Sequence, residues 1–432
     1  MAAVASVLTL LIVTLGAGVW VGFSLFAVGI ISLELFRSMP VEKLLAQNLW
    51  GNLTSPELIA LPLFIFMGEL LYRTRLASDL FKGLSLWTNR LPGRLLHVNV
   101  LGCTIFAAIS GSSAATTVTV GRITLRELLS RGYDRGLVIG SLAGAGTFGF
   151  LIPPSIFLIV YGVLAEASIL KLFLAGIVPG LVLALAYMVY IGVRASLNSD
   201  LVPNDETAVT WGERIKGLAY LGPPLCLIFA VLGSMYGGLA SPTEAAAVGV
   251  FGALVLGIAQ RSLSLDGFYK ASLGAVRTTS MIGLIVAGAF FLSVAMAFLG
   301  VPQLIATAIA GLELGPISLI LVLIVFYAAL GCIMEGLSMI VMTLPITLPL
   351  ILQAGFDKIW FGIFLVVVVE MAQITPPIGF NLFVLQSLTK DEVTRTARYA
   401  LPFFLILLGF ALFIGLVPDL VTFLPSSVQF RN

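Results

Sequence analysis

The chain has 432 residues, of which 59% are hydrophobic and only 10% are charged, and its mean hydropathy is +1.11. This composition excludes an ordinary soluble globular domain and is typical of a polytopic helical membrane protein embedded in the lipid bilayer. A net charge of +2 gives no sign of a nucleic-acid partner. The only histidine, His97, and three widely separated cysteines form neither a zinc-site pattern nor a disulfide framework.

Apolar segments follow one another along most of the chain. They cover residues 2–16, 20–36, 56–72, 95–130, 136–166, 171–194, 217–236, 243–260, 274–299, 316–352, 359–388 and 399–424. Residues 76–91 and 301–313 are shorter and are interpreted as amphipathic or interfacial. The first 16 residues lack a basic region, so we expect a membrane element there and not a cleaved signal. The sequence "SPTE", Ser241 to Glu244, has the pattern of a capping box and predicts a helix start at Pro242.

Two of the apolar segments, 95–130 and 316–352, are too long for a single crossing, which takes about 20 residues. Each has small or polar residues near its middle: "AISGSSAATTVTVG", Ala108 to Gly121, and "ALGCIMEGLSMIVMT", Ala329 to Thr343. We therefore expect two re-entrant hairpins, each made of two half-length helices folded back on themselves. Two ordinary tilted helices are the alternative.

Two other segments, 136–166 and 359–388, each contain a pair of adjacent prolines, Pro153–Pro154 and Pro376–Pro377. Proline lacks an N–H and clashes with the carbonyl four residues earlier, so each pair is expected to break its helix. The breaks would leave main-chain carbonyls without donors at Gly149, Phe150, Ala372 and Gln373. Such backbone survives inside a membrane only beside protein or a wet cavity, and a small hard cation bound by oxygens would satisfy it. Because no cluster of histidines or cysteines suggests a transition metal, Na⁺ is the natural candidate.

Polar side chains crowd the expected hairpin tips and could complete these sites. They are Ser110, Ser112, Ser113, Thr116, Thr117 and Thr119 in the first tip, and Glu335 and Ser338 beside Gly331 in the second. Ser155 and Thr375 add hydroxyls at the breaks. The free N–H groups of the half-helices suit an anionic substrate such as a carboxylate. Ser113, Thr116 and Asn381 are the candidate substrate contacts.

Two acidic residues, Glu335 and Glu370, fall within apolar segments, where an ionisable side chain usually indicates function. They could be ion ligands, proton carriers, or buried partners of a hydroxyl or lysine, and the sequence leaves these alternatives open.

A polar linker, residues 195–216, divides the chain into halves, 1–194 and 217–432. A repeat relates the halves, because "RGYD" and "AGFD" begin at Arg131 and Ala354, and "IPPSIF" and "TPPIGF" at Ile152 and Thr375, with one constant offset. The loop after the first hairpin is rich in arginine, whereas its counterpart, 344–358, holds only Lys358. Under the positive-inside rule, equivalent loops then lie on opposite faces, which predicts inverted-topology repeats with a cytoplasmic linker. The first hairpin then opens from the cytoplasm and the second from outside.

Five stretches, taken together, resemble the large membrane subunit (M, DctM-like) of tripartite ATP-independent periplasmic (TRAP) transporters. They are "FIFMGELL" at Phe64, "SGSSAATTVTVG" at Ser110, "GTFGFLIPPS" at Gly146, "SPTEAAAVG" at Ser241 and "ITPPIGFNLFVL" at Ile374. The resemblance covers essentially the whole chain. It implies an elevator-type, Na⁺-coupled importer of organic acids, such as C4-dicarboxylates or sialic acid, in the bacterial inner membrane. It also implies a separate small four-helix membrane subunit (Q type) and a periplasmic substrate-binding protein (P type).

By motif match, the resemblance implies two Na⁺ sites. The first would use Ser110, Ser112, Gly149 and Ser155, and the second Gly331, Ala372, Thr375 and Ile378. Many members have a glycine before the second proline motif where this chain has Ala372-Gln373, so the role of Gln373 is open.

Two other functions compete with a Na⁺-coupled permease. The first is the same fold working alone as an anion transporter, without a binding protein. The second is an intramembrane enzyme, which is disfavoured because the chain contains no HExxH motif, no GxSxG motif with a suitable histidine and no paired aspartates within its spans. The expected activity is therefore transport and not catalysis.

Overall fold

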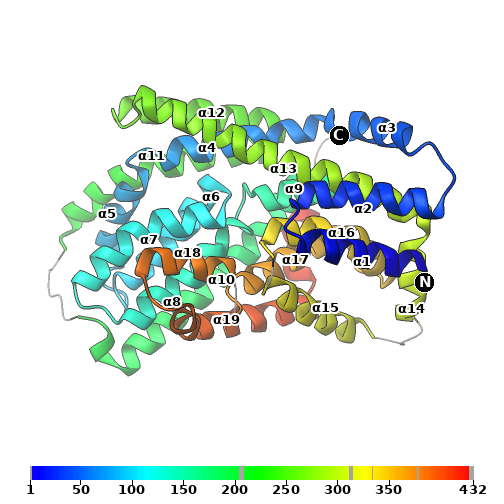
Figure 1. The fold of residues 1–432 in the computed structure, drawn as a ribbon. Helices are drawn as coiled ribbons and strands as arrows, with labels where there is room; N and C mark the ends of the chain where they lie inside the picture. The colour runs from blue at the N-terminus through cyan, green and yellow to red at the C-terminus, as the bar shows by residue number, and fades with distance from the viewer. Residues whose placement is uncertain (1, 204–208, 311–314, 333, 377–378, 428–432) are drawn as a thin grey trace.

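The computed structural model describes residues 2–203, 209–310, 315–332, 334–376 and 379–427, and all the regular structure in these ranges is helical (Figure 1). The helices of the first half are α1 (Ala2–Gly16), α2 (Val21–Phe36), α3 (Val41–Leu53), η1 (Pro56–Ile59), α4 (Ala60–Tyr72), α5 (Leu76–Thr88), α6 (Leu96–Ser110), α7 (Ser113–Ser130), α8 (Arg135–Ala145), η2 (Gly146–Gly149), α9 (Ile156–Leu164) and α10 (Ile169–Leu197).

The second half continues with the same kind of structure. Its helices are α11 (Trp211–Tyr236), α12 (Pro242–Ala259), α13 (Leu265–Leu299), α14 (Val301–Ala310), α15 (Pro316–Gly331), α16 (Gly336–Gln353), α17 (Lys358–Gln373), α18 (Phe380–Thr389), α19 (Val393–Leu416) and α20 (Asp419–Ser427), and the short η3 (Ser199–Leu201) lies in the linker before them. Within the described residues, six helices are long and apolar enough to cross a membrane, or seven if the bent pair α3 and η1–α4 is one span. The predicted all-α polytopic fold is confirmed.

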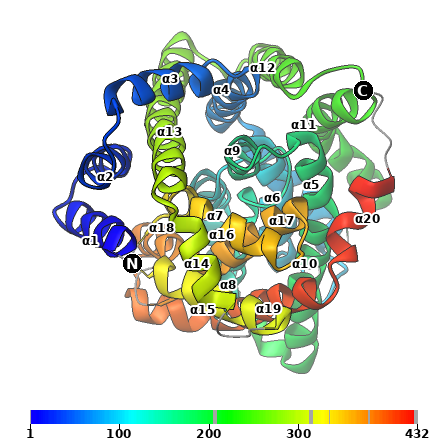
Figure 2. The same cartoon turned by 90° about the vertical axis from the view of Figure 1, so that its right-hand side faces the viewer.

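An outer layer of helices runs along one side of a central group. The outer layer consists of α1–α5 with α11–α13, in which α2 packs on α13, α4 on α12 and α13, and α5 on α11. In Figure 2, α9, α16 and α17 lie in the middle of the molecule, with α1–α4, α12 and α13 along its margin. Large apolar side chains such as Phe229, Phe251 and Val276 are exposed on the outer helices, as a lipid-facing surface requires.

Helix α17 forms the centre of the fold. Every residue from Ile359 to Gln373 is buried, because other helices cover this helix on all sides. The indole Nε1 of Trp360 donates a hydrogen bond of 2.9 Å to the carbonyl of Ile414 on α19. The N-terminal end of α17 is therefore tied to α19.

The segment 95–130 consists of two helices, α6 and α7, packed against each other and joined at Gly111. Gly111 has a left-handed φ of 58°, and an added Cβ there would lie 2.9 Å from the carbonyl oxygen of Pro154. Only glycine suits this turn, because it must be both left-handed and closely packed. The segment 316–352 is divided in a similar way into α15 and α16, with Glu335 as the N-cap of α16.

The segments with paired prolines are interrupted at those prolines. Helix α8 tightens into the 3₁₀ turn η2, and α9 begins only at Ile156, after Pro153 and Pro154. Likewise, α17 ends at Gln373 and α18 begins at Phe380. The order hairpin, broken helix, long helix thus occurs once in each half, as α6 to α10 and as α15 to α19.

Several boundaries differ from those predicted. The linker is shorter than 195–216, because α10 continues to Leu197 and α11 starts at Trp211, where Thr210 and Glu213 form a capping box. Helix α13 starts nine residues before the apolar segment 274–299, in a polar stretch. Helix α3 was missed because its mixed polar and apolar sequence lacks a long apolar run. The helix start predicted at Pro242 is confirmed, together with its capping box.

Candidate functional site

The tip of the first hairpin is a compact network of hydroxyl groups. The hydroxyl of Ser110 lies 3.0 Å from that of Thr116, and Thr116 donates to the carbonyl of Ser112 over 2.7 Å. The Ser112 hydroxyl accepts from the amide of Ala115, which makes Ser112 the N-cap of α7. Three predicted site residues are thus brought together by the turn itself.

The first helix break packs directly against this tip through main-chain atoms. A Cβ added to Gly149 would lie 2.5 Å from the carbonyl carbon of Ser112 and 2.6 Å from the amide nitrogen of Ser113. No hydrogen bond to the carbonyl of Gly149 is formed by the described residues, as the missing N–H of Pro153 predicts. Gly149 of the first predicted site therefore has a carbonyl without a donor and packs against the main chain of the tip.

The expectation of a free carbonyl at Phe150 was wrong. The hydroxyl of Ser155 donates a hydrogen bond to the Phe150 carbonyl and replaces the amide that Pro154 lacks. The same Ser155 oxygen accepts from the amide of Leu158 and caps α9. Ser155 therefore lies beside the break, and its hydroxyl proton is already donated to the Phe150 carbonyl.

Two predicted substrate contacts of the tip, Thr116 and Ser113, have different surroundings. Thr116 is bonded within the tip, whereas the buried hydroxyl of Ser113 has no hydrogen-bond partner among the described residues. A buried hydroxyl without a partner costs free energy unless a ligand or water satisfies it. The Ser113 hydroxyl thus has hydrogen-bonding capacity that the described residues leave unused.

The third predicted substrate contact, Asn381 on α18, is fully buried and links three helices. Its Oδ1 accepts from the hydroxyl of Thr117 over 2.8 Å, and its Nδ2 donates to the carbonyl of Ala143 over 2.9 Å. A residue of the second broken helix therefore joins the first hairpin to the first broken helix. In this arrangement, Asn381 holds the elements of the site together.

The second predicted site repeats the contact between hairpin and break. A Cβ added to Gly331, at the end of α15, would lie 2.8 Å from the carbonyl oxygen of Ala372. The thiol of Cys332 lies 3.3 Å from the carbonyl of Pro376. Ile378, a predicted ligand, lies outside the described residues. Gly331 and Ala372 are thus in contact, as the two members of one site must be.

The Ala372 carbonyl was expected to lack a donor, and this was wrong. The amide of Thr375 donates to it over 3.2 Å, because the last turn of α17 tightens from the α to the 3₁₀ pattern. The Thr375 hydroxyl donates to the carbonyl of Met371 over 2.8 Å. A carbonyl has two lone pairs, so the Ala372 oxygen retains the capacity to accept a cation.

The acidic residues of the apolar segments differ in their surroundings. Glu335 caps α16, with Oε2 accepting from the amide of Ser338 over 3.3 Å. Glu370 and Gln373 are fully buried on α17, and neither side chain has a hydrogen-bond partner among the described residues. The charge of Glu370 within an apolar segment marks it in the sequence as a candidate functional residue, whereas the sequence leaves the role of Gln373 open.

A cavity of about 330 Å³ lies beside the first hairpin tip, between it and the outer helices. Residues from α4, the hairpin, α9 and α13 line it: Ile65, Gly68, Glu69, Tyr72, Ser110, Ser112, Ala114, Ala115, Val118, Ile156 and Thr278. Helix α4 approaches closely because Gly68 has no side chain; a Cβ there would lie 3.0 Å from the carbonyl of Ser110.

The carboxylate of Glu69 is the only charged group lining this cavity among the described residues, and it lies 3.4 Å from the guanidinium of Arg73. The stretch "FIFMGELL" contains Glu69, but the sequence alone gives Glu69 no role, because its position depends on how α4 packs on a distant hairpin. The described residues hold no group of three or more histidine, cysteine, aspartate or glutamate side chains that could bind a metal ion. The oxygens of the two predicted sites belong instead to hydroxyls and main-chain carbonyls.

The family described as "Tripartite ATP-independent periplasmic transporter, DctM component" matches residues 8–420. The chain belongs to this family. As a DctM component, it is a transporter permease of the bacterial inner membrane with several membrane crossings, and not an enzyme.

Curated relatives cover most of the chain. It is 34% identical over 399 residues to the C4-dicarboxylate TRAP transporter large permease protein DctM of Pseudomonas aeruginosa, with 92% of each chain covered. It is 31% identical to the ectoine/5-hydroxyectoine TRAP transporter large permease protein UehC of Ruegeria pomeroyi, covering 96% of this chain and 94% of the relative. The isethionate TRAP transporter permease protein DctMQ of Oleidesulfovibrio alaskensis is 33% identical over 96% of this chain, which spans 64% of that longer protein.

A solved structure shares the fold. The YdaH transporter of Alcanivorax borkumensis superposes with a TM-score of 0.65 over 87% of both chains, although only 13% of residues are identical. The similarity extends to the arrangement of helices alone.

Proposed function

We propose that this chain is the permease subunit of a Na⁺-coupled secondary importer of small organic acids. The observation that carries the proposal is the main-chain contact at the first hairpin tip, where Gly149, whose carbonyl has no donor among the described residues, packs against the Ser112–Ser113 peptide. The hydroxyls of Ser110, Ser112 and Thr116 belong to the same tip. Hard, uncharged oxygen ligands of this kind suit a small monovalent cation.

Two Na⁺ sites would be formed, each between a hairpin and a break. The proposed ligands of the first are Ser110, Ser112, Gly149 and Ser155, and of the second Gly331, Ala372, Thr375 and Ile378. The contacts of Gly149 with the Ser112–Ser113 peptide and of Gly331 with Ala372 support this pairing, because each brings a predicted hairpin residue against a predicted break residue. A cation in either site would bind both elements at once and couple their positions.

The substrate would bind at the cavity beside the first tip. Ser110 and Ser112 of the tip support this location, because they line the cavity. Ser113 does not line it, although its buried hydroxyl has no partner among the described residues. Three relatives are named for C4-dicarboxylates, ectoine and isethionate, which all carry an acidic group. A carboxylate or sulfonate could be bound by hydroxyls and by helix N-terminal amides, without a buried arginine. The side chain of Asn381 is already hydrogen-bonded to Thr117 and to the carbonyl of Ala143, so these hydrogen bonds would have to rearrange before Asn381 could contact a substrate.

The halves 1–194 and 217–432 would be inverted repeats, with the hairpins and broken helices moving against the outer helices in an elevator mechanism. The cavity between the first tip and α4 and α13 lies at the boundary across which such movement would occur. A small four-helix membrane subunit and a periplasmic substrate-binding protein would complete the transporter, as the tripartite family description supports.

The test is uptake into proteoliposomes that contain this chain with its small membrane subunit. Labelled succinate, isethionate and other organic acids are supplied with the binding protein, under an inward Na⁺ gradient or with Na⁺ replaced by K⁺. We expect uptake of one acid that requires both Na⁺ and the binding protein. Equal uptake in K⁺ would refute Na⁺ coupling, and equal uptake without the binding protein would refute the three-component assembly.

A further inference from the structure

A basic cleft lies between the two halves of the chain, at the far end of α7 from the hairpin tip. It encloses about 340 Å³ between α7 and α18 and is lined by Gly121, Arg122, Leu125, Arg126, Leu129, Arg135, Leu388 and Thr389. The positive-inside rule places this end of α7 at the cytoplasmic face. The volume is within the usual range for small-ligand sites, about 300–1,000 Å³.

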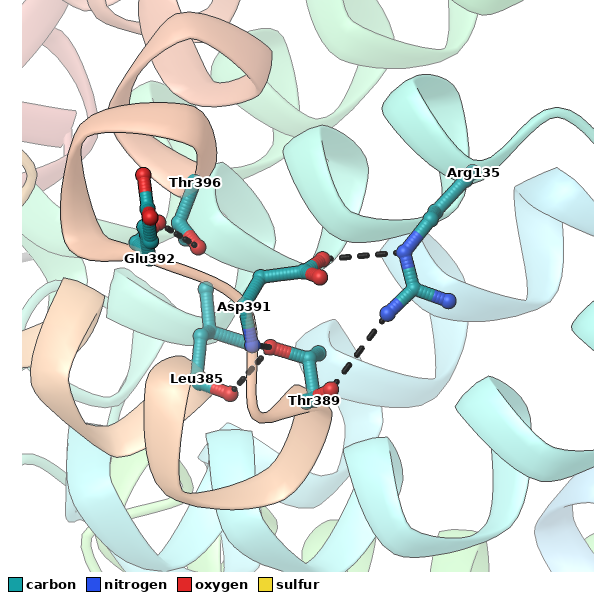
Figure 3. A network of polar contacts seen from close by, with 6 residues as sticks. All are labelled: Arg135, Leu385, Thr389, Asp391, Glu392 and Thr396. Atoms are coloured by element: carbon teal, nitrogen blue, oxygen red, sulfur yellow. Dashed lines mark hydrogen bonds and ion pairs between the residues drawn. The ribbon is translucent and has the colours of Figure 1, made fainter.

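One of the three arginines is fixed in place by the second half. Arg135 donates from Nε to Oδ2 of Asp391 over 2.9 Å and from Nη2 to the carbonyl of Thr389 over 3.3 Å (Figure 3). The turn that presents Asp391 contains Lys390 with a left-handed φ of 57°, and the Asp391 amide donates to the Thr389 hydroxyl. Arg135 is therefore oriented, and its remaining nitrogen, Nη1, takes no part in these bonds.

The other two arginines have no acidic partner. Arg122 and Arg126 are one turn apart on the same face of α7, and neither forms an ion pair with a described residue. The nearest acid in sequence, Glu127, lies 3.5 Å from Arg131 instead. Like charges at this spacing repel each other, and the carboxylate of Asp391 is already paired with Arg135. The cleft therefore has two uncompensated positive charges beside a third guanidinium that is held in place.

We propose that this cleft binds a phosphate-type oxyanion, either the headgroup of an anionic lipid or a free phosphate. Guanidinium groups bind phosphate oxygens through paired hydrogen bonds, and several of them converging on one point suit a dianion better than a monovalent carboxylate. A bound phosphate would connect Arg122 and Arg126 of the first hairpin to Arg135, which the turn after α18 holds. It would thus strengthen the junction between the two halves. This site is separate from the proposed substrate and Na⁺ sites and does not depend on them.

The test uses the purified full chain in nanodiscs of phosphatidylcholine. One arm titrates inorganic phosphate, with acetate at equal ionic strength as the control, and follows the thermal unfolding midpoint Tm. The other arm adds phosphatidic acid to the nanodiscs and measures lipid retained on the protein by native mass spectrometry. Binding to the folded state raises Tm, so saturating phosphate or phosphatidic acid should raise it by a few degrees, whereas acetate should not.

Matched variants assign the effect to the cleft. Arg122→Gln and Arg126→Gln should each raise the dissociation constant about tenfold, the loss expected for one charge-assisted hydrogen bond. Arg395→Gln removes a charge from an exposed arginine on α19 outside the cleft and should leave binding unchanged. A response to phosphate alone assigns the site to a free anion, and retention of phosphatidic acid alone assigns it to a lipid. Absence of both responses, an equal response to acetate, or an equal loss in all three variants would overturn the proposal.

Discussion

Replacement of Gly149 by alanine tests the contact between the first break and the first hairpin tip. The added methyl group would lie 2.5 Å from the carbonyl carbon of Ser112, 2.6 Å from the amide nitrogen of Ser113 and 2.7 Å from the Ser112 oxygen. All three are main-chain atoms of a capped turn, so no side chain can rotate to make room. The hairpin tip must retreat by most of an ångström before these contacts become ordinary.

The magnitude follows from the cost of overpacking, which is about 1–3 kcal/mol for an added methylene in a tight site. If the cation holds tip and break in the native position, this strain opposes binding, and the Na⁺ concentration for half-maximal uptake should rise about 5- to 150-fold. The assay is Na⁺-dependent uptake into proteoliposomes, with Tm measured on the same preparations.

Gly102→Ala is the matched control, because Gly102 lies on the same hairpin and an added Cβ would be 3.6 Å from the nearest atom of Val120. Alanine there should leave Na⁺ dependence unchanged and could raise stability by about 1 kcal/mol through its higher helix propensity. Unaltered Na⁺ dependence in Gly149→Ala, with the protein folded, would refute the assignment of this contact to a cation site.

Three further predictions concern other parts of the fold. Thr375→Ala should raise the Na⁺ requirement of uptake, with Thr375→Ser as the control; an unchanged requirement would count against the second site. Asn381→Ala should lower the free energy of unfolding by about 1–3 kcal/mol in a denaturation experiment, because the buried hydroxyl of Thr117 loses its acceptor. An unchanged free energy of unfolding would contradict the role of Asn381 in linking the helices. Single cysteines at Arg131 and Asp357 should react with a membrane-impermeant reagent from opposite faces, and labelling from one face would exclude inverted repeats.

The interruptions of the helices could be predicted from sequence because their causes are local. Proline removes a main-chain N–H donor wherever it occurs in a helix. The turn at Gly111 requires a left-handed backbone, which glycine adopts without strain. The response of the chain to a missing donor was harder to foresee. Ser155 donates a hydrogen bond to the Phe150 carbonyl, and the amide of Thr375 donates one to the Ala372 carbonyl. The α-helical pattern would leave both carbonyls free, and both hydrogen bonds depend on the conformation of the chain after the break.

The cavity at Glu69 and the cleft at Arg135 could not be predicted in the same way. Each is formed by segments far apart in the chain: Glu69 lies beside the tip at Ser112, and Arg135 bonds to Asp391 across 256 positions. Single-sequence patterns describe the neighbours of a residue along a helix, whereas these sites depend on which helices pack together. The same limit applies to Asn381, which was assigned to substrate and is found bonded to two helices of the other half.

The position of Asn381 also bears on how the protein is made. Synthesis proceeds from the N-terminus, so α7 and α8 reach the membrane long before residue 381 leaves the ribosome. During that interval Thr117 and the Ala143 carbonyl must remain near water or find temporary partners, since lipid offers none. The N-terminal half therefore cannot complete its folding alone. A ribosome stalled after the linker should yield a nascent chain that membrane quality-control proteases degrade.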